Sequence, residues 1–281
     1  MMIASFLLSL ERMRAGLRRK SIAIEGLAMP YLEGGRGEPL LLIHGFGGDK
    51  DNFTRLAGKL TRRYRVLIPD LPGFGEAGRD PSLSYAIADQ ARRLAGFVAA
   101  LGIDRVQVGG NSMGGQIAVE LAAAYPDKVS ALWLLAPAGT AAAFDTEVVR
   151  TYAAGGEMPL LVRTPRQVEA MIAVTMSRPP FMPRSVRRFL GRRACADRPL
   201  HSKIMAELHG HPPSLDLLGR TLPVRSVIVW GSEDRILNPR AAERMREILP
   251  NSEVVMLDGI GHVPMLEAPG RVAKIFLAHT P

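Results

Sequence analysis

Gly109-Gly110-Asn111-Ser112-Met113-Gly114-Gly115 is the stretch of sequence that decides the fold. It follows an apolar run that ends at Val108 and precedes apolar residues at helical spacing that begin at Ile117. A G-x-S-x-G pentapeptide between a strand and a helix is typical of a nucleophile elbow, where small neighbours permit a sharp turn that exposes the serine hydroxyl. Because the chain contains 28 glycines, a Gly-Ser turn without chemistry is the alternative, which only partners for Ser112 can exclude.

The composition indicates a folded globular protein. With 281 residues, the chain is long enough for one large α/β domain or two smaller ones. A hydrophobic content of 47% and a charged content of 22% exclude a disordered chain. The single cysteine, Cys195, excludes an internal disulfide framework, and no catalytic motif surrounds it.

Strands and helices are expected to alternate along most of the chain, which is typical of a doubly wound, mostly parallel sheet. Two short antiparallel strands are expected first, at 21–25 and 28–32. The remaining elements are strands at 40–43, 65–69, 105–108, 131–135, 225–230 and 253–257 and helices at 52–60, 84–101, 240–249 and 265–279, besides the helix after the elbow.

Residues 140–220 interrupt this alternation. Four helical pieces separated by Pro and Gly are expected there, at 146–154, 165–176, 183–196 and 200–209. Because the chain enters and leaves the stretch between neighbouring sheet elements, a helical cap over an active site is favoured over an independent second domain. The predicted organisation is an amphipathic segment at 1–20, a core at 21–139 and 221–281, and a cap at 140–220, before the last two strands.

A serine nucleophile needs a base that accepts its proton and an acid that orients the base. Asp234 follows the expected strand at 225–230, and His262 follows the last expected strand. The order Ser112, Asp234, His262 is the one known for nucleophile-elbow hydrolases, so we predict these three as catalytic residues. The alternatives are a turn role for Asp234, a surface position for His262, and Glu233 as the acid. Asp234 is preferred because it directly precedes Arg235-Ile236-Leu237-Asn238-Pro239, where this loop usually places its acid.

The charge that develops on the attacked carbonyl oxygen needs hydrogen-bond donors already in place. The backbone N–H groups of Met113 and Phe46 are the predicted donors of this oxyanion hole, with Phe46 in the loop His44-Gly45-Phe46-Gly47. A dinucleotide site in that loop is disfavoured because its glycines do not form G-x-G-x-x-G. No cofactor and no metal are expected: His201, His209 and His211 have no Cys or carboxylate at ligand spacing and are interpreted as solvated or core residues.

The formal net charge of +9 is concentrated in two stretches. Residues 1–20 hold five Lys or Arg and one acid, and residues 140–220 hold twelve Lys or Arg and seven acids. Elsewhere the two signs balance. Basic patches on a neutral body favour an anionic surface as partner, and no recognised nucleic-acid module accompanies the charge.

The first ten residues are apolar, about half of the ~20 needed to span a bilayer. Their positive charges come after the apolar run, which disfavours a secretory signal. On a helix, one face would carry Met2, Phe6, Leu10, Met13 and Leu17. Such a helix either lies in an anionic membrane interface or packs on the body of the protein. We expect a cytoplasmic protein, with peripheral membrane association as the open question.

Taken together, the motifs resemble those of the α/β-hydrolase superfamily over nearly the whole chain. They are His44-Gly45-Phe46-Gly47-Gly48, Asp70-Leu71-Pro72-Gly73-Phe74-Gly75, the elbow, Trp230-Gly231-Ser232-Glu233-Asp234 and Gly261-His262. Within that superfamily, Ser112-Met113-Gly114-Gly115-Gln116 and Met265-Leu266-Glu267-Ala268-Pro269 are similar to segments of monoacylglycerol lipase-like, membrane-associated enzymes and related bacterial lipases. The resemblance implies hydrolysis of monoacylglycerol-like or medium-chain lipid esters through an acyl-enzyme.

Two other functions are compatible with the same motifs. Carbon–carbon bond hydrolases of meta-cleavage products share the Gly-Asn-Ser-Met-Gly-Gly elbow, but a tryptophan usually follows their catalytic histidine, and here Val263 follows His262. Non-catalytic ligand-binding proteins of the same fold commonly lose a triad member, whereas all three residues are present here. Ester hydrolysis is therefore the leading hypothesis.

Overall fold

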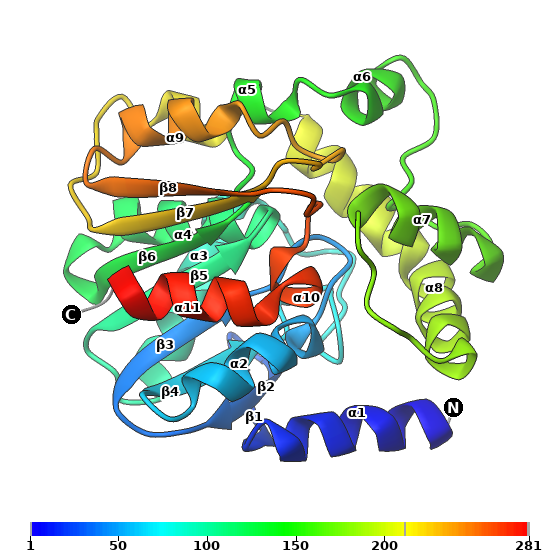
Figure 1. Cartoon of the computed structure of the whole chain (residues 1–281), viewed down its shortest axis with the longest axis horizontal. Coiled ribbons are helices and arrows are strands. Elements are labelled where there is room, and N and C mark those ends of the chain that lie inside the picture. Colours follow the sequence, from blue (N-terminus) through cyan, green and yellow to red (C-terminus); the bar gives the residue numbers. More distant parts are fainter. Residues whose placement is uncertain (1, 211, 280–281) are drawn as a thin grey trace.

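An eight-stranded sheet forms the centre of the molecule in the computed structural model, which describes residues 2–210 and 212–279 (Figure 1). Its strand order is β1-β2-β4-β3-β5-β6-β7-β8, and the six strands from β4 to β8 in this order run parallel. The two antiparallel pairings, β1 with β2 and β2 with β4, lie at one edge. The strands are β1 (Leu17–Ile24), β2 (Leu27–Gly34), β3 (Glu38–Ile43), β4 (Tyr64–Pro69), β5 (Val106–Asn111), β6 (Val129–Leu135), β7 (Ser226–Gly231) and β8 (Ser252–Leu257).

Helices cover both faces of the sheet, which is why its central strands are continuous apolar runs. Two cores result. One contains Phe97, Ile117 and Met245 and lies under α3 (Ile87–Ala100), α4 (Met113–Ala124) and α9 (Ala241–Ile248). The other contains Leu56 and Phe276 and lies under α2 (Thr54–Leu60), α10 (Pro264–Glu267) and α11 (Pro269–His279). The doubly wound, mostly parallel sheet expected from the alternation of elements is confirmed.

The regular secondary structure described between β6 and β7 is helical. It contains α5 (Ala141–Phe144), α6 (Glu147–Ala153), α7 (Val168–Thr175) and α8 (Arg184–His209), and no strand among the described residues. Figure 1 shows these helices beside one end of the sheet, with α8 as their longest member. A helical insertion therefore precedes the last two strands, as predicted.

Two prolines act differently from the sequence-based expectation. Separate helices were expected at 183–196 and 200–209, but α8 is continuous and contains Pro199. After the proline, His201 and Ile204 are buried, and before it Asp197 forms an ion pair with Arg79 (3.0 Å). These contacts keep the two halves of α8 in one helix, although an interior proline costs about 3 kcal/mol. The expected helix at 265–279 is instead divided after Glu267, because the residue before Pro269 is disfavoured in the helical region.

The amino terminus also differs from the expectation. Helix α1 ends at Arg14, and Leu17 begins β1, so Leu17 does not share the helical face and the strand starts earlier than residue 21. Helix α1 packs against α2, β1 and α8. Phe6 and Met13 nevertheless stay 67% and 68% exposed. The helix thus packs on the body and still presents an apolar face; the side chain of Met2 and residue His211 lie outside the described part of the chain.

We predict that Pro199→Ala raises the free energy of unfolding by about 1–3 kcal/mol, because it restores a backbone donor inside α8. Urea denaturation of the purified protein measures the change. Pro179→Ala, in the exposed segment before α8, is the control and should leave stability unchanged or lower it by less than about 1 kcal/mol. Equal effects of the two substitutions would contradict the prediction.

Candidate active site

The turn between β5 and α4 places Ser112 at the carboxyl edge of the sheet. Its backbone has φ +56° and ψ −121°, a conformation that costs a non-glycine residue about 1–3 kcal/mol. Hydrogen bonds hold the turn: the Ser112 N–H donates to the Leu135 carbonyl (3.0 Å), and the Ser112 carbonyl accepts from the N–H of Ala138 (3.0 Å). This is the strained geometry of a nucleophile elbow.

Two glycines make the turn possible, as the sequence predicts. A Cβ on Gly110 would lie 2.2 Å from the carbonyl oxygen of Gly114. A Cβ on Gly114 would lie 2.2 Å from the carbonyl oxygen of Ile43. Strand β5 and helix α4 can therefore approach each other and β3 only because these side chains are absent.

The structure brings Asp234 and His262 together. Nδ1 of His262 lies 2.8 Å from Oδ2 of Asp234, and both residues are buried. The same Oδ2 accepts from Nε1 of Trp230 (2.9 Å), while Oδ1 accepts from the N–H groups of Ile236 (2.9 Å) and Leu237 (3.0 Å). With four donors around it, the carboxylate cannot rotate, and it holds the imidazole with Nδ1–H toward Asp234 and the Nε2 lone pair free.

Glu233, the competitor for the acid role, does not contact His262. Its Oε2 accepts a hydrogen bond from Oγ of Ser177 (2.8 Å) near the surface. Asp234 is the carboxylate that pairs with His262.

Asn111 is a site residue that the sequence reasoning did not single out. Its amide Nδ2 donates to two carbonyl oxygens, those of Leu135 and of His262, each at 3.0 Å. The side chain therefore joins the end of β5 to the loop that carries His262. Its place directly before Ser112 was the available signal.

Two backbone N–H groups next to Ser112 are free to bind an oxyanion. Those of Met113, the first residue of α4, and of Phe46 donate to no acceptor among the described residues. Nδ1 of His44 donates to the Gly45 carbonyl (2.8 Å), and Nε2 accepts from the N–H of Leu71 (3.0 Å). Because a trans peptide directs its C=O and N–H oppositely, this contact turns the Phe46 N–H away from His44. Burial lowers the pKa of His44 below its usual value and keeps the ring neutral.

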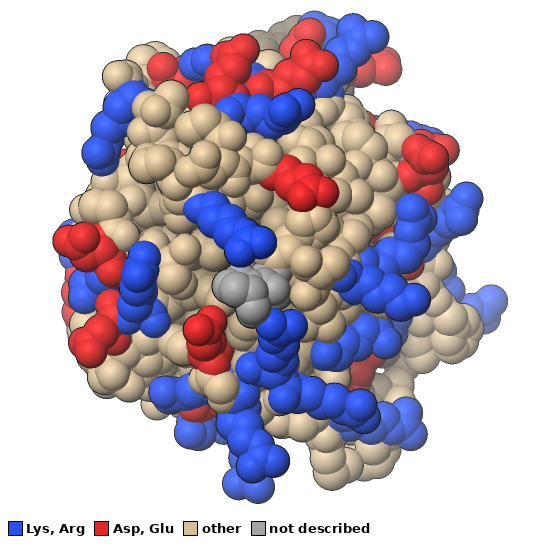
Figure 2. Space-filling view, turned by 60° about the vertical axis from the view of Figure 1, so that its left-hand side comes forward, with Lys and Arg blue, Asp and Glu red and all other residues tan. Residues whose placement is uncertain are grey.

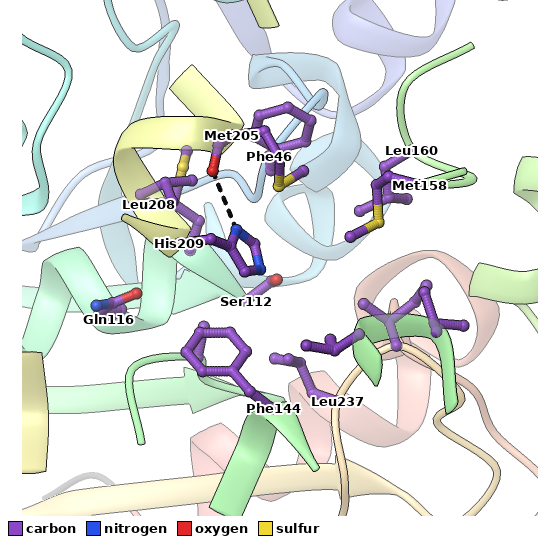
Figure 3. A pocket seen from close by; sticks show the side chains of 15 residues that line it. Phe46, Ser112, Gln116, Phe144, Met158, Leu160, Met205, Leu208, His209 and Leu237 are labelled. Carbon is purple, nitrogen blue, oxygen red and sulfur yellow. Dashed lines mark hydrogen bonds between the residues drawn. The ribbon is translucent and has the colours of Figure 1, made fainter. Parts of the chain in front are cut away.

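A pocket that is partly open to solvent lies above Ser112 (Figure 3). The lining is mostly apolar, with side chains from the β3–α2 loop, the inserted helices and the loop after β7. The larger ones are Phe46, Phe144, Met158, Leu160, Met205 and Leu237. Besides Ser112, its polar side chains are Gln116 and His209, among the residues the structure describes.

Comparison with known proteins agrees with this geometry. Residues 38–269 match the family model described as alpha/beta hydrolase fold. Lipase 1 of Psychrobacter immobilis is 36% identical over 276 residues, which cover 95% of this chain and 86% of the relative. The chain belongs to the α/β-hydrolase family.

Other members of the family are similar along most of their length. The human monoacylglycerol lipase ABHD6 is 26% identical over 86% of this chain and 76% of its own. A crystal structure of a membrane phospholipase A has a TM-score of 0.93 and 37% identity, and covers 99% of this chain and 91% of that one. A meta-cleavage product hydrolase from Pseudomonas fluorescens IP01 has a TM-score of 0.76 at 24% identity, and the match covers 92% of this chain and 96% of that one. This likeness shows a shared fold alone.

In this α/β-hydrolase, helix α8 contacts the loop that carries Phe46. The buried ring of His201 lies 5.4 Å from the ring of Phe46 and 4.8 Å from that of Phe74. Burial lowers the pKa of His201 to about 4, so the ring is neutral and packs as a core residue. On the same helix, Arg193 forms an ion pair with Asp49 of that loop. His209, by contrast, lines the pocket, which its interpretation as a solvated or core residue did not foresee.

Neither a membrane span nor a metal cluster occurs in the described part of this hydrolase. None of its helices combines the length and the apolar character needed to cross a bilayer. Over the same residues, no group of three or more His, Cys, Asp or Glu side chains is arranged to hold a metal ion.

We predict that Asn111→Leu lowers kcat for a p-nitrophenyl ester at least about tenfold, with a smaller change in KM. The substitution preserves volume but removes the amide that positions the His262 loop, and a lost buried hydrogen bond costs about 1–3 kcal/mol. Steady-state kinetics and urea unfolding measure both effects.

Gln107→Leu is the matched control, because Gln107 is also buried on β5 but donates to Glu38 (2.7 Å), away from Ser112. It should lower stability and leave kcat unchanged. The positioning role of Asn111 would be wrong if both variants changed kcat by the same factor.

Proposed function

We propose that this protein is a serine hydrolase of carboxylic esters in which Ser112 is the nucleophile, His262 the general base and Asp234 the acid that orients it. The observation that carries the proposal is the buried His262–Asp234 pair at 2.8 Å, in the same edge of the sheet as the strained turn at Ser112. Acyl transfer by an elbow serine requires an acid and a base, and in this fold they follow the serine along the chain in that order.

The reaction follows from these positions. Nε2 of His262 accepts the proton of Ser112 Oγ as the oxygen attacks the ester carbonyl, and the resulting oxyanion accepts hydrogen bonds from the N–H groups of Met113 and Phe46. His262 then donates the proton to the leaving alcohol, which leaves an acyl-enzyme. Water, deprotonated by His262, releases the acid. One oxyanion donor contributes about 3–4 kcal/mol to lowering such a barrier.

The inserted helices support a lipid ester as the substrate. We propose that α5–α8 and the segments between them form a cap, since α5 and α8 supply Phe144 and Met205 to a pocket with few polar groups. The segment after α6 supplies Met158 and Leu160. A chain of methylene groups gains about 0.8 kcal/mol for each CH₂ buried in such surroundings. The relatives are named as bacterial lipases and a monoacylglycerol lipase, and these names point to the same class of substrate, lipid esters.

We further propose that α1 attaches the enzyme peripherally to an anionic lipid surface. Phe6 and Met13 form its exposed apolar face, and Phe181, 86% exposed, precedes α8, against which α1 packs. Arg14 and Arg18 are exposed and form no ion pair among the described residues. In Figure 2, Lys and Arg side chains gather in the lower half of the face shown. Apolar side chains beside cations suit a membrane interface.

Carbon–carbon bond hydrolysis is the second candidate, and no specific observation favours it. The meta-cleavage product hydrolase shares the fold at 24% identity, and Val263 here occupies the position after His262.

We predict that Ser112→Ala lowers kcat for p-nitrophenyl esters and monoacylglycerols by about 10⁴-fold or more, and abolishes labelling by a fluorophosphonate probe. Ser130→Ala, in β6, is the control and should retain both activity and labelling. A panel of esters from acetate to oleate gives the acyl preference, for which the apolar pocket predicts medium chains over acetate. Retained ester hydrolysis in Ser112→Ala would refute the assignment.

We predict that the double substitution Phe6→Ser, Met13→Ser weakens binding to vesicles of anionic lipid at least about fivefold and leaves turnover of a soluble ester unchanged. Point substitutions are needed because β1 begins at Leu17, so deletion of residues 1–20 would remove part of the sheet. Leu217→Ser, which changes a 67% exposed side chain after α8, is the control. Equal binding by all three proteins in a co-sedimentation assay would exclude α1 as the attachment site.

A further inference from the structure

Two polar side chains interrupt the apolar lining of the pocket above Ser112, and the proposed mechanism uses neither. They are Gln116, on α4, and His209, at the end of α8. More than a third of His209 is exposed, so it lies where the pocket opens to solvent. The apolar part of the lining suits an acyl chain, and these two residues are placed to contact the other part of an ester, its alcohol.

The ring of His209 presents a hydrogen-bond acceptor to the pocket. Its Nδ1 lies 3.0 Å from the carbonyl oxygen of Met205, and since a carbonyl can only accept, Nδ1 carries the proton. In the neutral imidazole, Nε2 then carries the lone pair, and it has no partner among the described residues. The rings of Phe144 and Tyr152, each at a centroid distance of 5.6 Å, hold the imidazole in place. Figure 3 shows its free nitrogen on the side of Ser112.

Gln116 presents a second acceptor. Its Nε2 donates to Oγ of Ser214 (3.0 Å), which turns the amide nitrogen away from the pocket. In Figure 3 the oxygen of Gln116 is on the side of His209 and Ser112. This oxygen has no hydrogen-bond donor among the described residues. Contacts made before any substrate binds thus orient both acceptors, so little conformational entropy is lost when a ligand binds them.

We propose that His209 and Gln116 bind free hydroxyl groups of the substrate's alcohol, and so determine a preference for esters of polyols that keep unesterified hydroxyls. Both side chains present only hydrogen-bond acceptors to the pocket, and hydroxyl groups supply the hydrogens that such acceptors bind. The acceptors do not match phosphate oxygens, which are acceptors themselves, or a methyl ester, which has no donor. The side chain of Gln116 is buried, and a buried acceptor that loses its partner is costly, so the site discriminates against alcohols that lack the hydroxyl. The inference rests on the proposed ester hydrolysis and concerns only the choice of alcohol.

The test compares two esters of the same acyl chain, 1-monodecanoylglycerol and methyl decanoate. The measured quantity is the ratio of their kcat/KM values, so that effects on the acyl pocket or on folding cancel. His209→Phe keeps a ring between Phe144 and Tyr152 but removes the acceptor, and Gln116→Leu keeps volume without the carbonyl. Each should lower the ratio about three- to tenfold, the range expected for the loss of one hydrogen bond. His209→Gln, which returns a side-chain carbonyl, should restore part of the ratio.

Leu160→Ala is the matched control, because Leu160 lines the same pocket: it should change kcat/KM for both esters by the same factor. The inference is overturned if His209→Phe and Gln116→Leu leave the ratio unchanged while the wild-type enzyme hydrolyses both esters in a manner that depends on Ser112. If the wild type hydrolyses neither ester, the proposed function itself is wrong and this inference with it.

Discussion

The strained turn at Ser112 depends on close contacts between backbones, and the surrounding structure depends on that turn. A residue with φ +56° is stable here because its N–H and carbonyl are both hydrogen bonded and because Gly110 and Gly114 allow β3, β5 and α4 to meet. The strain has a chemical use. It directs the serine side chain out of the sheet and leaves the N–H of Met113, at the positive end of the α4 dipole, without an intrahelical acceptor.

A second constraint holds the loop that carries Phe46. Beneath it, Nζ of Lys50 lies 2.7 Å from Oδ2 of Asp70, and both side chains are almost fully buried. Removal of one partner from such a pair typically costs about 3–5 kcal/mol. Above it, burial raises the pKa of Asp49, but Arg193 and Lys50 outweigh this effect and lower it to about 2. The loop is therefore ionically bound to the core on one side and to α8 on the other.

The same helices contact both the Phe46 loop and the pocket. Helix α8 supplies Arg193 and His201 to the Phe46 loop and, farther along, Met205 and His209 to the cavity. The amino-terminal helix reaches the same loop from the other side, where Nε of Arg12 donates to Oδ1 of Asp51 (2.6 Å). A displacement of either helix would remove the partner of a carboxylate within a few residues of Phe46. The geometry of the proposed oxyanion donors is thus linked to the positions of α1 and α8.

The sequence by itself determined the parts of this protein that depend on local chemistry. The elbow around Ser112 and the alternating sheet could be predicted because small residues, turns and apolar periodicity act over a few positions. The order of Ser112, Asp234 and His262 along the chain added the pair that the structure places 2.8 Å apart.

The tertiary structure alone decided the rest. The amide of Asn111 contacts a carbonyl 151 positions away, and no local pattern specifies that contact. Helix α8 continues through Pro199, with buried side chains after the proline and the ion pair of Asp197 before it. Residues from Leu17 onward join the sheet because β2 pairs with them. His209 looks like any solvated histidine in the sequence. It becomes a pocket residue because the fold brings the end of α8 over a serine almost a hundred residues earlier in the chain.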